Sequence, residues 1–181
     1  ALALARRLGA FDGVPEASRA AIARMIEAGV STPRARGLGR WFDALGALAL
    51  SLPRAGFEGH VAVALEECAD AGEGRAYPVA SPRDLCLDGA FGEAHEVDLR
   101  PTLRAAVTDL LAGVAAPTVA ARFHQTLVEV TAATAVRALE ATGLRRVVLS
   151  GGCMQNHLLT EGITRRLGAE RARMAREGEG L

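Results

Sequence analysis

The chain has 181 residues, of which 50% are hydrophobic and only 4% aromatic. This length suffices for one sizeable core or for one lobe of a larger protein, and we expect a lobe. With few aromatic side chains, the core must be built mainly from Ala, Leu and Val, which favours closely packed helices. The 21 basic residues balance 21 acidic ones, so charge gives no reason to expect nucleic acid or an anionic membrane as a partner.

Signals for export, disulfides and metal are weak in this sequence. The N-terminus lacks the residue order of a signal peptide, and no apolar run approaches 18 residues, so we expect a soluble, cytoplasmic chain. Because the chain does not begin with Met, we interpret it as a fragment. The three cysteines are far apart and the four histidines lack the spacing of metal ligands, so no metal site is predicted.

The spacing of apolar residues predicts a series of helices before residue 143. Their expected ranges are 15–29, 38–52, 58–71, 99–112 and 117–142. Pro15 stands at the first turn of the first helix, and Gly29 and Gly143 are typical of helix ends. Between the helices expected at 58–71 and 99–112, the pattern predicts two short strands at 77–79 and 96–98, bounded by Gly, Pro and Asp.

A third strand is expected at 147–149, followed by the turn Ser150-Gly151-Gly152 and a helix over 155–166. Paired glycines let a backbone approach a ligand closely, and a helix N-terminus offers free N–H groups. The same pattern is also ordinary punctuation between a strand and a helix, so both interpretations stay open here. Residues 168–181 are polar and aperiodic, which predicts a frayed or truncated tail.

Four short segments follow one another along the chain: GRWFDA at 39–44, FEGHVA at 57–62, RFHQTL at 122–127 and SGGCMQNHLL at 150–159. In this order they resemble GRLFDA, YEGQAA, RFHNTL and SGGVFQNRLL in the C-terminal carbamoyltransferase domain of HypF, a family of hydrogenase maturation proteins. The resemblance implies that residues 1–167 are the C-terminal part of such a domain.

The resemblance further implies a helix-rich α/β fold, one lobe of an actin-like ATPase (ASKHA, TsaD-like) domain. It implies that the complete enzyme uses ATP and carbamoyl phosphate to make carbamoyl adenylate. The carbamoyl group then passes to the C-terminal cysteine of HypE in nickel-iron hydrogenase maturation. The full-length family also uses a metal, and zinc in a zinc-finger region, whose ligands are not in this chain. Because transfer needs both lobes, we expect little or no activity from this chain alone.

The resemblance also implies which residues contact the nucleotide, although it assigns no catalytic residue. In the glycine turn, the backbone of Ser150, Gly151 and Gly152 would approach the nucleotide. Asn156 would hydrogen-bond the adenosine moiety, since an amide offers both a donor and an acceptor.

A second group of expected contacts lies earlier in the chain. Asp43, on the same helix as Gly39, would accept hydrogen bonds from the ribose hydroxyls. Glu58 and Gly59 are expected nearby. Together with the glycine turn, these residues would form a binding site for ATP or carbamoyl adenylate.

The residues themselves leave alternatives open. Asp43 could face solvent, and Glu58-Gly59 could simply begin a helix. Arg40 could bind a phosphate or carbamoyl oxygen, or pair with a nearby Asp. His124 could support the site or be a core histidine.

Other functions are compatible with the same sequence features. Antibiotic O-carbamoyltransferases and the threonylcarbamoyl transferases that modify transfer RNA share the expected fold. A different class is a non-catalytic helical interaction domain, in which the glycine turn is only a corner.

Overall fold

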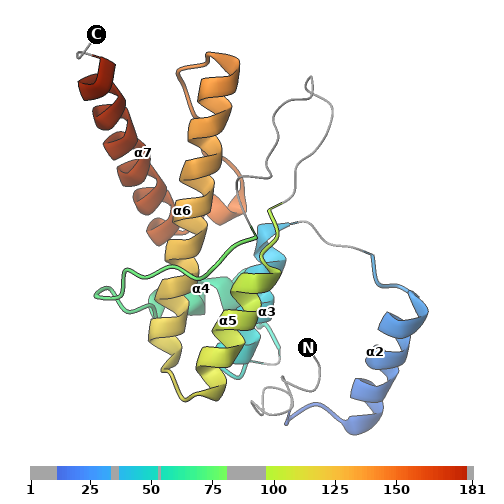
Figure 1. Ribbon diagram of the computed structural model, residues 1–181. Helices are drawn as coiled ribbons and strands as arrows, with labels where there is room; N and C mark the ends of the chain where they lie inside the picture. The colour runs from blue at the N-terminus through green and yellow to red at the C-terminus, as the bar shows by residue number, and fades with distance from the viewer. Residues whose placement is uncertain (1–11, 34–36, 53, 81–96, 179–181) are drawn as a thin grey trace.

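The computed structural model describes residues 12–33, 37–52, 54–80 and 97–178 (Figure 1). Helices dominate these residues, in the order α2 (Glu16–Ala28), α3 (Leu38–Ala49), α4 (His60–Glu67), α5 (Arg100–Leu111), α6 (Ala116–Thr142), the short 3-10 helix η2 (Gly152–Gln155) and α7 (His157–Gly178). In the described part of the chain, no helix is both long enough and apolar enough to cross a membrane.

The expected helices are all present, although α4 spans only His60–Glu67 instead of 58–71. The ends of α2 and α6 follow the Pro and Gly signals. Pro15 precedes α2, and Gly29 ends it in the left-handed conformation at φ 66°. Gly143 ends α6 in the same way at φ 69°. The expected length of the last helix was wrong, because α7 continues to Gly178 rather than ending near residue 166. Residues 179–181 of the expected tail lie outside the described residues.

The strands expected at 77–79 and 147–149 are wrong within the described residues, which form no β-strand. A strand requires a neighbouring strand to accept and donate its backbone hydrogen bonds. Tyr77 instead donates its N–H to the Thr126 hydroxyl on α6, at 2.7 Å. The strand expected at 96–98 begins outside the described residues; of its remainder, the Asp98 carbonyl accepts one bond from the Ala80 N–H at 3.3 Å.

Helix α6 is the centre of the fold. Figure 1 shows α7 running beside it and α3, α4 and α5 gathered around its first half. Phe42 of α3 and Phe123 of α6 pack edge to face with ring centroids 5.1 Å apart. The largest fully buried side chains come from these helices: Phe42, Phe123, Leu45, Leu65, Leu159, Ile163, Val119, Thr102 and Thr126. By contrast, α2 buries none of its residues.

Two glycines allow the helices to approach closely. A Cβ at Gly46 of α3 would overlap the side chain of Val61 on α4. A Cβ at Gly162 of α7 would lie 2.6 Å from Val128 Cγ2 on α6. Since β-branched side chains have little rotamer freedom in a helix, Val128 could not move aside at low cost. These glycines therefore set the α3–α4 and α6–α7 distances.

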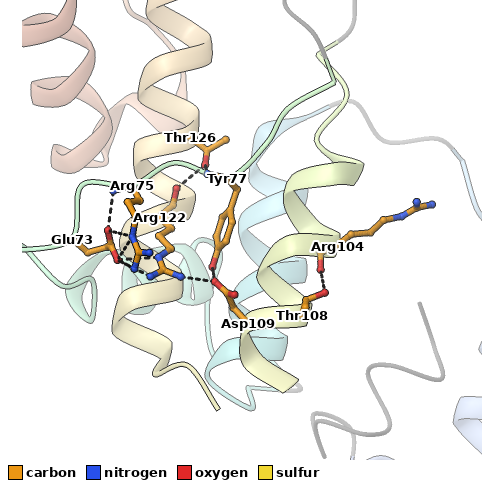
Figure 2. Close-up of polar contacts among 8 residues, drawn as sticks. All are labelled: Glu73, Arg75, Tyr77, Arg104, Thr108, Asp109, Arg122 and Thr126. Atoms are coloured by element: carbon orange, nitrogen blue, oxygen red, sulfur yellow. Dashed lines mark hydrogen bonds and ion pairs between the residues drawn. The ribbon is translucent and has the colours of Figure 1, made fainter. Parts of the chain in front are cut away.

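A cluster of polar side chains fixes the segment 73–77 against α5 and α6 (Figure 2). Arg122 of α6 pairs with Glu73 at 2.9 Å and with Asp109 of α5 at 2.6 Å. The Tyr77 hydroxyl donates to the same Asp109 carboxylate at 2.8 Å. Burial, followed by the Asp109 contact, raises the pKa of the Tyr77 hydroxyl well above its usual value. The cluster thus replaces the expected strand pairing as the anchor of this segment.

The glycine packing can be tested within α7. Gly162→Ala should lower the melting temperature, because overpacking a tight helix contact costs about 1–3 kcal/mol. Gly168→Ala is the matched control, since a Cβ there meets nothing within 4 Å. It should stabilise the chain by roughly 0.5–1 kcal/mol through helix propensity. Equal melting temperatures for the two variants would contradict the packing described here.

The polar cluster makes a second prediction. Tyr77→Phe should reduce the free energy of unfolding by about 1 kcal/mol, because it removes one hydrogen bond to Asp109. Arg122→Leu should cost more, because it leaves two carboxylates without their shared cation. Arg104→Leu is the control: Arg104 is exposed and points away from the cluster (Figure 2). Urea unfolding measures all three, and an Arg104 effect as large as that of Arg122 would contradict the assignment.

Candidate functional site

A pocket of about 610 Å³ lies between α3 and the loop that leads into α4. It collects residues from two of the four sequence segments, and its lining consists of Arg40, Asp43, Ala47, Leu52, Ala55, Gly56, Phe57, Glu58, Gly59 and Val61. Three expected site residues, Asp43, Glu58 and Gly59, therefore share one pocket although 15 positions separate Asp43 from Glu58. Gly39 is one residue before Arg40 on α3 but is not among the lining residues.

The local fold explains why these residues meet. The close contact of Gly46 with Val61 brings α3 and α4 together, and Asp43 is three residues before Gly46, on the same side of the helix. Gly59 begins α4 at φ 83°, a conformation that strongly favours glycine. A Cβ at Gly59 would meet nothing within 4 Å, so its backbone is open to the pocket.

Charges on the pocket wall are partly compensated. Arg40 Nη1 lies 2.9 Å from Asp43 Oδ2, and the side chains are 65% and 35% exposed. The interpretation of Arg40 as the partner of a nearby Asp is thereby confirmed. Because the pair is exposed to water, its contribution to stability is small, and both groups keep capacity for further hydrogen bonds.

The glycine turn forms as a compact, exposed corner before α7. Ser150, Gly151 and Gly152 are exposed, and the Met154 N–H donates to the Gly151 carbonyl at 3.0 Å. Gly151 has φ 96°, which a residue with a side chain rarely adopts. The backbone of this turn is thus accessible to a ligand. None of these residues lines the pocket beside Asp43.

Asn156 is buried, with only 8% of its surface exposed. Its Oδ1 accepts the Leu159 N–H at 3.0 Å and so caps α7. Its Nδ2 donates to His124 Nε2 at 3.0 Å. His124 is 3% exposed, and burial lowers its pKa. The structure therefore places Asn156 beneath the turn, inside the fold, and makes His124 both a core residue and its direct partner.

Helix α3 connects the two groups of expected site residues. Phe42, next to Asp43, contacts the His124 ring with centroids 5.3 Å apart. His124 in turn holds Asn156 at the end of the glycine turn. The pocket and the turn are thus separate features, and they are connected inside the fold by the contacts of Phe42 with His124 and of His124 with Asn156.

Sequence reasoning missed two residues near these features. Phe57 lines the pocket with 61% of its surface exposed, and its ring stacks on His60 with centroids 4.8 Å apart. Glu66, near the end of α4, accepts the His157 N–H at 2.6 Å. The signal available for Phe57 was its place at the start of the FEGHVA segment, which carries part of the family resemblance. No local pattern marks Glu66.

The potential metal ligands of the described residues are their His, Cys, Asp and Glu side chains. Among the described residues, no group of three or more His, Cys, Asp or Glu side chains is placed to hold a metal ion. The free cysteines Cys68 and Cys153 are both partly buried.

Comparisons with known proteins support the family resemblance. Residues 3–179 match the family model described as the second subdomain of the carbamoyltransferase, Kae1-like domain. The chain is 36% identical over 165 residues to carbamoyltransferase HypF2 of Cupriavidus necator, covering 81% of this chain and 20% of that protein. It is 34% identical to the carbamoyltransferase HypF homolog of the same organism, covering 92% of this chain and 41% of the relative.

A solved structure shares the fold. The crystal structure of full-length HypF in a phosphate- and nucleotide-bound form superposes with a TM-score of 0.76 at 25% identity, covering 93% of this chain and 21% of that one. The chain spans between one fifth and two fifths of the length of these curated relatives. Its helix-rich fold is thus that of a lobe of the actin-like, Kae1-like domain, and the chain belongs to the HypF family of carbamoyltransferases.

Proposed function

We propose that this chain supplies the adenosine-binding part of a HypF-type carbamoyltransferase. The complete enzyme would use ATP and carbamoyl phosphate to form carbamoyl adenylate and would transfer the carbamoyl group to the C-terminal cysteine of HypE. The observation that carries the proposal is the shared pocket of Asp43, Glu58 and Gly59. The nucleotide-bound form of the similar HypF structure supports the class of ligand.

The pocket residues fit a ribose. The carboxylates of Asp43 and Glu58 accept hydrogen bonds, and a vicinal diol donates two. The backbone at Gly59 leaves room for close approach, because no side chain occupies that space. A volume of about 610 Å³ is within the range of small-molecule sites. In this proposal Gly39 contributes the start of the helix that carries Asp43 rather than a wall of the pocket.

The glycine turn would supply the second set of contacts. The exposed backbone of residues 150–152 can approach polar atoms of the nucleotide without a side chain in the way. Residues 1–167 would form the lobe that carries both features. The reaction centre would be completed by other parts of the enzyme, since no catalytic residue is assigned to this chain.

Nucleotide binding tests the proposal directly. ATP and a carbamoyl-adenylate analogue should raise the melting temperature of this chain. Asp43→Asn should weaken ATP binding by about tenfold or more, because hydrogen bonds to a charged group contribute about 1.5–3 kcal/mol. Glu67→Gln is the control, because Glu67 is exposed on α4 and does not line the pocket. A folded wild-type chain with no shift from either ligand would contradict adenosine binding.

The requirement for both lobes makes a separate prediction. This chain alone should transfer little or no labelled carbamoyl group from carbamoyl phosphate to HypE, whereas a complete HypF should transfer it under the same conditions. Radiolabel in HypE, separated by gel electrophoresis, measures the transfer. Transfer by the 181-residue chain at a rate comparable to that of complete HypF would overturn the two-lobe requirement.

A further inference from the structure

The buried contact between His124 and Asn156 has a fixed direction. His124 Nδ1 lies 2.8 Å from the Ala120 carbonyl oxygen, which can only accept a hydrogen bond. The proton must therefore be on Nδ1, and Nε2 is left as an acceptor. Asn156 Nδ2 donates to this nitrogen at 3.0 Å.

This direction also fixes the amide of Asn156. With Nδ2 turned toward His124, Oδ1 is turned toward the Leu159 N–H, which it accepts at 3.0 Å. Rotating the amide by half a turn would exchange the two atoms. It would then place an N–H group against the Leu159 N–H and lose the helix cap. The tautomer of His124 and the cap of α7 thus depend on each other.

The same residue is linked to the backbone of the glycine turn. The Asn156 N–H donates to the Cys153 carbonyl at 3.3 Å. One turn into α7, the Thr160 hydroxyl donates to the Met154 carbonyl at 2.6 Å. Two hydrogen bonds therefore connect the start of α7 to residues 153 and 154 just after the glycine turn. Asn156, which makes one of them and caps α7, is itself bonded to His124.

We propose that His124 is a positioning residue. By accepting a hydrogen bond from Asn156, it orders the start of α7. The ordered start of α7 in turn holds η2 and the glycine turn in the conformation that binds nucleotide. The effect on nucleotide binding rests on the proposed function of this chain, whereas the ordering of the turn by His124 does not. Asn156 then contributes through the shape of the turn, which agrees with its burial.

Protonation of His124 would abolish this arrangement, because Nε2 would become a donor facing the donor Nδ2. The side chains facing the imidazole are Phe42 from α3, Phe123 from α6 and Asn156 at the start of α7. Burial lowers the pKa of His124, while the Ala120 bond and the Glu66 carboxylate on α4 oppose the shift. The contact is therefore complete above pH 6.5, the ordinary value, and is lost as the pH falls through the lowered pKa.

The first measurement uses the whole 181-residue chain labelled with ¹⁵N. Long-range ¹H–¹⁵N spectra should report the Nδ1–H tautomer for His124 near neutral pH. Hydrogen exchange should show that protection of the Leu159 amide, relative to that of Val107 in α5, is constant above pH 6.5 and falls as the pH passes through the lowered pKa of His124. The Nε2–H tautomer, or a protection ratio that does not change with pH, would overturn the inference.

The second measurement compares three variants. His124→Phe keeps a ring in the core but removes the acceptor, His124→Gln keeps an acceptor, and Thr126→Val removes a different buried hydrogen bond on the same helix. His124→Phe should speed exchange of the Leu159 amide by about tenfold and weaken ATP binding several-fold. His124→Gln should recover part of the Leu159 protection and part of the ATP affinity. Thr126→Val should leave ATP binding unchanged, and it should leave Leu159 exchange unchanged relative to that of Val107.

The outcomes separate this inference from the proposed function. Equal Leu159 exchange in His124→Phe and Thr126→Val would overturn the positioning role. If the wild-type chain does not bind ATP, adenosine binding fails, while the tautomer and the Leu159 exchange still decide whether His124 orders the turn. If His124→Phe does not fold, the pH series on the wild-type chain decides the same question.

Discussion

The rest of the structure depends on one buried face of α6 and on the ion pairs, ring contacts and hydrogen bonds that this face makes with neighbouring elements. The RFHQTL segment provides most of these contacts within two turns of helix. Arg122 pairs with Glu73 and with Asp109 of α5, Phe123 packs against α3, and His124 bonds the residue that begins α7. Thr126 accepts the backbone N–H of Tyr77. One short segment thus anchors elements from four parts of the chain, which gives it a structural role distinct from direct ligand contact.

The two candidate binding features differ in how they are supported. The pocket beside Asp43 is built from a helix hairpin whose closeness depends on Gly46, and its charged residues are partly exposed. The glycine turn is an exposed backbone corner supported from below by a buried polar pair. A pocket lined by side chains can change its contacts by rotamer movement. A turn that presents only its backbone cannot, so its geometry depends on the residues that support it. In our proposal, the order of the turn therefore depends on the His124–Asn156 pair.

Much of the fold and part of the site could be predicted from the sequence. Helix positions followed from apolar spacing, and the ends at Gly29 and Gly143 from the unusual backbone freedom of glycine. The common neighbourhood of Asp43 and Glu58 followed only from the family resemblance, because no periodicity links positions on two different helices. The strands predicted at 77–79 and 147–149 do not form, because a strand requires a pairing partner that local composition cannot reveal. The burial of Asn156 was not predictable, because a residue that caps a helix and a residue that contacts a ligand have the same sequence pattern, and burial depends on tertiary packing.

One feature of the fold has a practical consequence for handling this chain. Residues 143–150 connect α6 to η2 without forming a helix or a strand, and Val148 is 84% exposed, with Leu144 at 62%. An exposed apolar stretch such as 147–149 is a site at which a strand from another molecule can pair, and the neighbouring charges of Arg145 and Arg146 limit such pairing. We therefore expect any self-association of concentrated samples to involve this segment. Dilute conditions or a charged substitution at Val148 are suitable precautions for spectroscopy and crystallisation.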